Sequence, residues 1–335
     1  MSLNVQPPAT QKQNSDGVSD PDFATTVVLV NYNSGKLLGR SLRALFQQRL
    51  APQAIIVVDN ASSDGSEMSP ELSDPRITLI AAQTNLGFAG ANNLALAKVT
   101  TKWTALLNPD CFPEPEWLEK LLAATANHPR AASFASRLMD ANASRRLDGA
   151  GDAYHLSGLF WRRRHQQILT TADLQPRALF SACAAAALYR TAAVTEAGAF
   201  DERFFCYGED VDLGYRLQLL GYDCLYVPDS VAHHVGSAIS GARSAFTLFH
   251  GHRNLEWVFF KNTPTALLPL LLPLHLAMLV ASLAVFWRHG ELAIYLSAKK
   301  AALKGLPPIW QSRQNVLSRR SRTLWGLLRR FSLYY

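Results

Sequence analysis

Acidic side chains stand at three points of this sequence where apolar runs end. Asp59 closes one such run, Asp110 follows another within three positions, and Glu209 and Asp210 come after the largely aromatic stretch 204–207. A carboxylate placed like Asp110 can hold Mg²⁺ or Mn²⁺, cations that share oxygen ligands with substrate phosphates. A carboxylate beside an apolar wall, like Asp210, can act as a general base. The residue types therefore favour metal-assisted chemistry on a phosphate-bearing substrate.

Asp59 has two interpretations, which the sequence leaves open. At the end of a buried strand its carboxylate can accept the N3–H of a uracil or thymine ring, on which Tyr32 could stack. It can equally cap the turn 60–66, as Asp often does. Asp110 has a similar alternative as a turn residue after Pro109.

Three acids within 209–212 open a predicted helix that runs toward Gly221. Acids at a helix N-terminus interact favourably with the helix dipole, so one or two of them could be simple caps, and Asp212 is assigned that role. His233 and His234 are adjacent on a segment predicted to be extended, where neighbouring side chains point to opposite faces. One histidine could therefore bind a metal while the other packs against the protein.

These residues need elements that bring them together, and the sequence predicts an α/β fold with a mainly parallel sheet flanked by helices. Continuous β-branched and apolar runs mark strands buried on both faces, and helical spacing recurs between them. In such sheets ligands bind beyond the carboxyl ends of the strands, which is where the polar loops lie. The predicted strands are 26–30, 54–59, 77–81, 103–107 and 181–189, with helices at 36–48 and 91–99.

The stretch 130–175 is predicted to be a loop. It carries two basic clusters, 145–146 and 162–164, and an aromatic pair at 160–161. It is either a solvated loop or a flexible lid over phosphates, and the sequence leaves both interpretations open.

The positive charge of this chain is concentrated in its tail. The formal net charge is +7, but ten Lys and Arg stand against a single Glu from residue 287 onward, which gives the tail +9 and the remainder −2. A uniformly basic nucleic-acid binder is therefore excluded, and no nucleic-acid partner is expected. The partner of the tail must be sought separately.

An uncharged apolar segment, 266–287, precedes this tail. Its 22 residues could span a bilayer, but Pro269, Pro273 and His275 weaken a plain transmembrane helix. A single span would also separate the body from the basic tail, whereas Lys and Arg prefer the cytoplasmic side. We therefore expect a peripheral or monotopic protein on the anionic cytoplasmic face of the inner (plasma) membrane, with a single span left open. The alternative is a soluble helical subdomain whose apolar run forms a homo-oligomer interface.

The chain is expected to have three parts. Residues 1–22 are polar and predict a disordered leader without a signal peptide. A catalytic domain is expected over 23–250, and a C-terminal helical, membrane-associating region over 251–335. Four scattered cysteines without a CxxC pair predict buried thiols in a reducing compartment, and a disulfide pair stays open.

Six motifs occur in the order seen in family 2 glycosyltransferases of the rhamnosyltransferase-like group, and the sequence resembles that family over residues 25–240. The motifs are VVLVNYNSGKLL, IIVVDNASSDGS, NLGFAGANNLAL, LLNPD, GAFDERFFCYGEDVDLGYRLQLLGY and VPDSVAHHVGS. The resemblance implies the GT-A fold, a nucleoside-diphosphate-sugar donor, a divalent metal (Mg²⁺ or Mn²⁺) and inversion at the anomeric carbon.

The resemblance also implies roles for individual residues. Asp59 would hold the nucleoside base, and Asp210 would be the catalytic base beside Glu209. The family's Asp-x-Asp pattern is Asn-Pro-Asp here, so the metal is assigned mainly to the final Asp. The candidate metal ligands are Asp110 and one of His233 and His234, with the choice between the two left open. The donor site is expected to comprise Asn31, Tyr32, Asp59, Asn60, Asn85, Gly87, Phe88, Asn93, Asn108 and Asp110.

The predicted function is an inverting, membrane-associated sugar transferase acting on a lipid-linked or cell-envelope glycan acceptor. Rhamnose from dTDP-rhamnose is the favoured donor, and UDP-galactofuranose and UDP-glucose are alternatives. A nucleotidyltransferase is disfavoured because the loop after the first strand lacks a glycine-rich basic signature. A non-catalytic sugar- or lipid-binding scaffold stays open.

Overall fold

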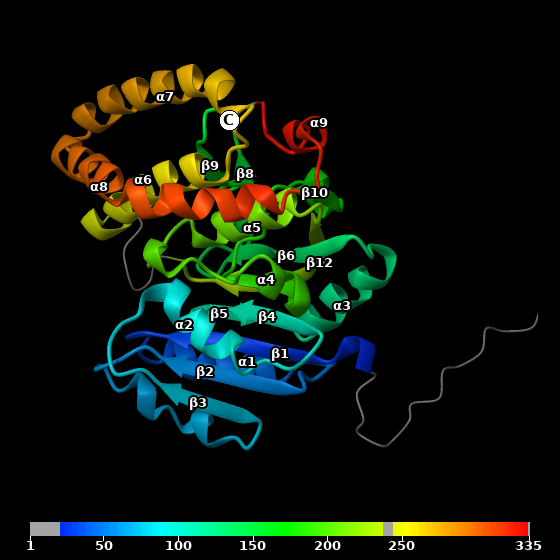
Figure 1. Ribbon diagram of the computed structural model, residues 1–335. Helices are drawn as coiled ribbons and strands as arrows, with labels where there is room; N and C mark the ends of the chain where they lie inside the picture. Colours follow the sequence, from blue (N-terminus) through cyan, green and yellow to red (C-terminus); the bar gives the residue numbers. More distant parts are fainter. Residues whose placement is uncertain (1–20, 237–243, 334–335) are drawn as a thin grey trace, which may run out of the picture.

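The computed structural model describes residues 21–236 and 244–333, so most of the expected leader, residues 1–20, lies outside the described residues. Its strands are β1 (Thr25–Asn31), β2 (Ala54–Asp59), β3 (Ile77–Ala81), β4 (Trp103–Leu107), β5 (Cys111–Pro113), β6 (Ala131–Asp140), β7 (Leu147–Gly149), β8 (Asp152–Tyr154), β9 (Phe160–Arg162), β10 (Arg177–Leu179), β11 (Ala186–Arg190) and β12 (Asp223–His234). The main sheet has the order β10-β12-β6-β11-β4-β1-β2-β3 (Figure 1). The short strands β5 and β7 pair with β12 and β6, and β8 pairs with β9 in a separate ribbon.

Most long strands of this sheet run in the same direction. β3, β2, β1 and β4 are parallel, and β6 and β12 are parallel to one another. β11 is antiparallel to both β4 and β6, so β6 and β12 point the same way as the first four strands. The carboxyl ends of β1, β2, β4 and β12 therefore lie along one edge of the sheet, where ligands bind in such folds.

Helices cover both faces of the sheet. They are α1 (Leu37–Phe46), α2 (Gly87–Leu96), α3 (Trp117–Asn127), α4 (Thr191–Glu196) and α5 (Glu209–Leu219), with 3₁₀ turns at Pro21–Phe23, Ser66–Met68, Pro70–Ser73, Thr171–Leu174 and Glu202–Phe204. Val27 and Leu29 of β1 pack into one core with α1 and α3. Val28 and Val30 pack into a second core with α2, α4 and α5. The period-two alternation of a strand thus supplies both cores from one apolar run.

Some predicted elements are wrong in extent. The stretch 130–175, predicted to be a loop, contains β6, β7, β8 and β9. The sequence does not reveal β6 because its Ala and Ser residues have weak strand propensity, whereas pairing with β11 and β12 holds the strand in place. The strand predicted at 181–189 starts only at Ala186, and the helix predicted at 91–99 already starts at Gly87.

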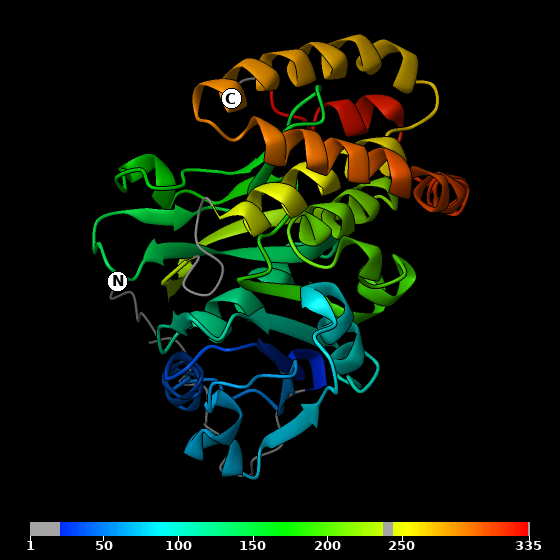
Figure 2. The same cartoon turned by 90° about the vertical axis from the view of Figure 1, so that its left-hand side faces the viewer.

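The C-terminal part is helical, as predicted. Its helices are α6 (Ala245–Asn262), α7 (Leu268–Arg288), α8 (Leu292–Ser318) and α9 (Leu324–Leu328). They gather beyond α5, and α7 lies outermost (Figures 1 and 2). The expected domain boundary at residue 250 falls inside α6, whose Trp257 and Phe259 share an apolar core with Tyr154 and Tyr215 of the sheet-containing part.

The protein leaves α7 mostly exposed. The mean hydropathy of its most apolar stretch is 2.2, and only 11% of that stretch is buried. By length and composition it is the one helix among residues 21–236 and 244–333 that could cross a membrane. Pro273 lies inside α7 without ending it.

Candidate active site

A cavity of about 740 Å³ opens at the sheet edge where the parallel strands end. Its walls come from the loops after β1, β2 and β4, from the end of β12 and from the first turn of α5. Most of the predicted site residues line it, namely Tyr32, Asn60, Asn85, Gly87, Phe88, Asn108, Asp110, Glu209, Asp210 and His234.

Asn31 and Asp59 form a buried layer and are not part of the cavity lining. Asn31 Nδ2 donates hydrogen bonds to Asp59 Oδ1 and to Ser66 Oγ, each 2.9 Å long. Asp59 Oδ2 accepts from the backbone N–H of Ser62 at 3.3 Å. Asp59 therefore caps the turn in the structure, as one of its two interpretations predicts. The contact of Asp59 with a nucleoside stays a prediction.

Asn60 and Asn85 form the adjacent wall. Asn60 Nδ2 donates to Asn85 Oδ1 at 2.9 Å, and Asn60 Oδ1 accepts from the N–H of Leu86 at 2.8 Å. Gly87 has a φ of +71° and touches Phe205 so closely that a Cβ would overlap that residue. Only glycine fits both conditions, and it lets α2 start directly against the segment that leads to α5.

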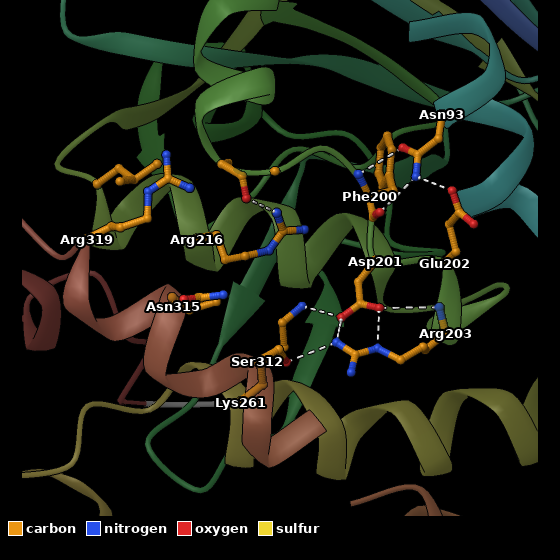
Figure 3. A pocket seen from close by; sticks show the side chains of 14 residues that line it. Asn93, Phe200, Asp201, Glu202, Arg203, Arg216, Lys261, Ser312, Asn315 and Arg319 are labelled. Atoms are coloured by element: carbon orange, nitrogen blue, oxygen red, sulfur yellow. Dashed lines mark hydrogen bonds and ion pairs between the residues drawn. The ribbon is translucent and has the colours of Figure 1, made fainter. Parts of the chain in front are cut away.

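Two predicted site residues lie away from this cavity. Asn93 faces a second cavity of about 580 Å³ between α2, α5 and α8, where its amide bonds the backbone of Phe200 (Figure 3). His233 is half-buried, and its Nε2 lies 3.1 Å from Glu114 Oε1. Adjacent residues of β12 point to opposite faces, so His234 is the histidine that reaches the active-site cavity.

His234 links Asp110 in the cavity wall to the buried carboxylate of Asp148. Its Nε2 lies 3.2 Å from Asp110 Oδ1, and its Nδ1 lies 2.7 Å from Asp148 Oδ2. Arg162 Nη1 also donates to Asp148 Oδ2, at 2.6 Å. Burial opposes protonation of the His234 ring, but the hydrogen bonds to both carboxylates outweigh it and raise the pKa of His234 to about 9. Burial by itself would raise the pKa of Asp148, but the positive charge of Arg162 outweighs burial, so the pKa of Asp148 is lowered.

Asp210 stands in the first turn of α5, oriented by two backbone N–H groups. Val211 N–H donates to Oδ1 at 2.8 Å and Ala184 N–H donates to Oδ2 at 3.3 Å. Burial raises the pKa of Asp210, and these hydrogen bonds moderate the rise. Asp152 and Cys183 lie beside it, with one ligand atom of each residue within 4.8 Å of the others. A half-buried carboxyl group with a raised pKa in a cavity is suited to accept a proton.

The other two acids of this turn, Glu209 and Asp212, are buried. Glu209 Oε2 has no hydrogen-bond partner among the described residues, and burial raises the pKa of Glu209 well above its ordinary value. Asp212, predicted to be a simple cap, instead accepts hydrogen bonds from Arg216 Nε and Lys261 Nζ, both at 2.9 Å. The prediction for Asp212 is wrong because one of its partners comes from α6, far along the chain.

A segment held by α6 leads into α5. The buried Asn254 Nδ2 donates to the carbonyl oxygens of Phe204 and Cys206 at 2.9 Å and to that of Tyr207 at 2.6 Å. Phe205 and Tyr207 have φ angles of +65° and +68°, a region that non-glycine residues rarely adopt. The strained segment therefore depends on Asn254, which in turn fixes where α5 and its acids begin.

Residues 26–196 match the sequence profile described as Glycosyl transferase family 2. The chain belongs to this family. N-acetylglucosaminyl-diphospho-decaprenol L-rhamnosyltransferase from Mycobacterium tuberculosis is 30% identical over 261 residues, which cover 70% of this chain and 83% of that protein. The similarity confirms the predicted rhamnosyltransferase-like group.

Solved structures share the fold of this glycosyltransferase. The mannosyltransferase PcManGT from Pyrobaculum calidifontis, in complex with GDP-Man and Mn²⁺, gives a TM-score of 0.52 at 20% identity, over 92% of this chain and 89% of that chain. GalNAc-T7 with UDP, GalNAc and Mn²⁺ gives a TM-score of 0.57 at 17% identity, over 71% of this chain and 48% of that chain. The predicted GT-A fold is thus confirmed.

Several residues in or next to the cavity of this glycosyltransferase carry no clear signal in its sequence. Asp148, Asp152 and Cys183 are absent from the predicted site, although the glycine-rich spacing DGAGD around the two acids could have drawn attention to them. Arg162 belongs to a cluster predicted to form a lid or a solvated loop, and it lies on β9 in the cavity wall. The other cluster, 145–146, is exposed.

Proposed function

We propose that this glycosyltransferase moves a sugar from a nucleoside-diphosphate donor to a hydroxyl of a lipid-linked or cell-envelope glycan acceptor, with inversion. The observation that carries the proposal is the cavity itself, which combines the Asp110–His234 pair with the half-buried Asp210. Rhamnose from dTDP-rhamnose is the favoured donor, because the name of the Mycobacterium tuberculosis relative specifies L-rhamnose and a decaprenol-linked acceptor.

Asp110 and His234 fit a divalent metal. Carboxylate oxygens suit Mg²⁺ and Mn²⁺, and an imidazole nitrogen is a common further ligand. Asp148 bonds the other ring nitrogen of His234, as the partner of a metal-bound histidine typically does. A bound Mg²⁺ or Mn²⁺ would supply positive charge where negative charge develops on the leaving diphosphate. The two structural neighbours contain Mn²⁺, which supports a divalent metal.

The sheet edge would bind the nucleoside half of the donor. Tyr32 and Asn60 line the cavity there, and Asp59 directly precedes Asn60 at the end of β2. The Tyr32 ring could stack on the base while the Asp59 carboxylate accepts its N3–H. Arg162, which lines the same cavity, would offset part of the diphosphate charge.

Asp210 would take the proton from the acceptor hydroxyl. The acceptor oxygen attacks the anomeric carbon from the face opposite the diphosphate, so one C–O bond forms while the other breaks and the configuration inverts. The electron pair of the breaking bond leaves with the nucleoside diphosphate. The raised pKa of Asp210 makes its carboxylate a stronger base for this step.

α7 and the basic tail would hold the enzyme, as a peripheral or monotopic protein, at the cytoplasmic face of the inner (plasma) membrane. Leu270, Val280 and Trp287 of α7 are 68%, 66% and 71% exposed. A helix with this many exposed apolar side chains is typical of a membrane or protein contact. An anionic membrane surface would attract the Lys and Arg residues that follow. A homo-oligomer interface is the alternative use of the same surface.

Donor turnover by the purified protein tests the proposal. The protein is incubated with Mg²⁺ or Mn²⁺, a lipid-linked N-acetylglucosamine acceptor and, in turn, dTDP-rhamnose, UDP-galactofuranose or UDP-glucose. We expect acceptor-dependent release of dTDP and a product mass increased by one rhamnose. Release of a nucleoside diphosphate from a different donor only would correct the sugar but leave the transferase activity in place. No release from any donor would favour a non-catalytic scaffold.

A further inference from the structure

A shallow apolar groove of about 530 Å³ lies between the N-terminal turns of α6 and α8. None of the described residues that line it carries a charge at neutral pH, since burial next to Arg253 lowers the pKa of His250 to about 4. The lining includes Phe246, Phe249 and His250 from α6, and Ala293, Ile294 and Ser297 from α8.

This groove lies next to the active-site cavity, with which it shares a wall residue. Phe246 lines both hollows and is 41% exposed. The centroid of its ring lies 6.2 Å from those of Phe205 and Tyr207, in the segment before the acids of α5. The ring also lies 4.4 Å from that of His250, which lines the groove and itself stacks on Phe205 at 5.4 Å. A hydrocarbon chain in the groove would therefore end beside the cavity that contains Asp210.

On the other side the groove is lined by the first turns of α8, and α7 leads directly into that end of α8 (Figures 1 and 2). Trp287, near the end of α7, is 71% exposed, and Leu296, the neighbour of Ser297 on α8, is 50% exposed. The groove thus lies near the junction of α7 and α8, which carries exposed apolar side chains, and beside the cavity of the sheet edge. A ligand with a polar head and a long hydrocarbon tail needs such a path, because removing apolar surface from water is favourable.

We propose that this groove binds the first isoprenoid units of a polyprenyl-diphosphate-linked acceptor, with the acceptor sugar next to Asp210 and the remaining chain in the membrane. The inference rests on the proposed function, because it takes the acceptor to be lipid-linked. The wall that the groove shares with the catalytic cavity at Phe246 favours the acceptor's own chain over a bulk membrane lipid, because only the acceptor must end in that cavity.

The test uses two acceptors with the same N-acetylglucosaminyl diphosphate head, one on a long polyprenyl chain and one on a short water-soluble alkyl chain. Ser297→Trp fills the groove, because Ser297 is exposed on its wall. Ser318→Trp is the matched control, since Ser318 is exposed at the opposite end of the same helix. We expect S297W to raise the KM for the long-chain acceptor on the order of tenfold or more, with kcat and the short-chain KM unchanged. S318W should match the wild type with both acceptors.

The outcomes separate this inference from the function on which it rests. Wild-type kinetics of S297W toward the long-chain acceptor would overturn the groove proposal and leave the proposed function intact. An equal loss toward both acceptors, or a parallel loss of binding to phosphatidylglycerol vesicles, would mean that the groove supports the fold or holds bulk lipid, and would also overturn it. Transfer by the wild type to neither acceptor would contradict the proposed function instead.

Discussion

Two regions build the cavity of this glycosyltransferase, and they are held in different ways. Asp110 and His234 lie at strand ends, where β12 pairs with both β5 and β6. Asp210 instead follows a segment with positive φ angles, whose carbonyl oxygens are held by the side chain of Asn254 on α6. The first region needs only the sheet, whereas the second needs a helix from the C-terminal part.

This difference gives the C-terminal helices a role in the active site, separate from the membrane contact proposed for them. Lys261 of α6 lies 2.6 Å from Asp201 Oδ2, in the stretch between α4 and α5 (Figure 3). The carbonyl oxygen of Pro308 in α8 accepts a hydrogen bond from Arg203 Nη1 at 2.6 Å. The segment that leads to Asp210 is therefore held by contacts with helices outside the sheet. The Asp110–His234 region and the Asp210 region should accordingly respond differently to substitution.

The largest effect is expected at the proposed base. Asp210→Asn should lower kcat by a factor on the order of 10² or more while donor binding stays near normal, because the amide cannot accept the proton. Burial raises the pKa of Asp210, so wild-type kcat should rise with pH as the carboxylate form increases, and the variant should lose this rise. Steady-state kinetics over a pH series, with donor binding measured by calorimetry, check both points. Turnover close to wild type in the variant would show that Asp210 is not the catalytic base.

The adjacent histidines test the sheet edge. His234→Ala should weaken Mn²⁺ binding by about 10- to 100-fold, because the variant loses the imidazole that faces Asp110. His233→Ala is the matched control and should bind Mn²⁺ like the wild type, since His233 faces Glu114 on the other side of the strand. Calorimetric Mn²⁺ titrations of both variants measure this, and similar losses would contradict the assignment.

The segment held by α6 is tested at Asn254. Asn254→Ala leaves three carbonyl oxygens without their donor, so kcat should fall about tenfold with the donor KM near wild type, and the free energy of unfolding should fall by about 2 kcal/mol. Asn315→Ala, at an exposed position of α8, is the control for amide loss. Kinetics and urea unfolding are measured together. An unchanged kcat in a destabilised variant would mean that α6 supports the fold without positioning Asp210.

The smallest effect is expected on stability at Glu209. Burial raises the pKa of Glu209, so the folded protein keeps a proton that the unfolded chain releases. The free energy of unfolding should therefore fall as the pH rises from the ordinary pKa of a glutamate toward the raised pKa of Glu209. Glu209→Gln removes this titration and should stabilise the protein at pH 8 by on the order of 1 kcal/mol. Urea unfolding at pH 5.5 and pH 8 measures the gain, with the exposed Glu119→Gln as control. A gain equal at both pH values would not come from ionisation of Glu209.

The sequence predicted the sheet edge better than the segment held by α6. Tyr32, Asn60 and Asp110 were accessible to prediction because each follows its own strand within a few residues, and parallel strand ends share an edge. Asp212 was misjudged because its acid could be explained as a cap from neighbouring residues alone, while Lys261 is distant in the chain. Asn93 satisfied a motif but faces another cavity, because a motif does not specify which side of a helix faces the ligand.

By itself the sequence determined the family, the mainly parallel sheet and the polar loops at its edge, because apolar periodicity and ordered motifs are local properties of the chain. Only the tertiary structure decided that His234 rather than His233 faces Asp110, since this depends on the register of β12. It also decided that Asp148 joins this pair and that Asn254 holds the approach to Asp210. Such contacts join residues that are far apart in the chain, and only folding brings them within hydrogen-bond distance.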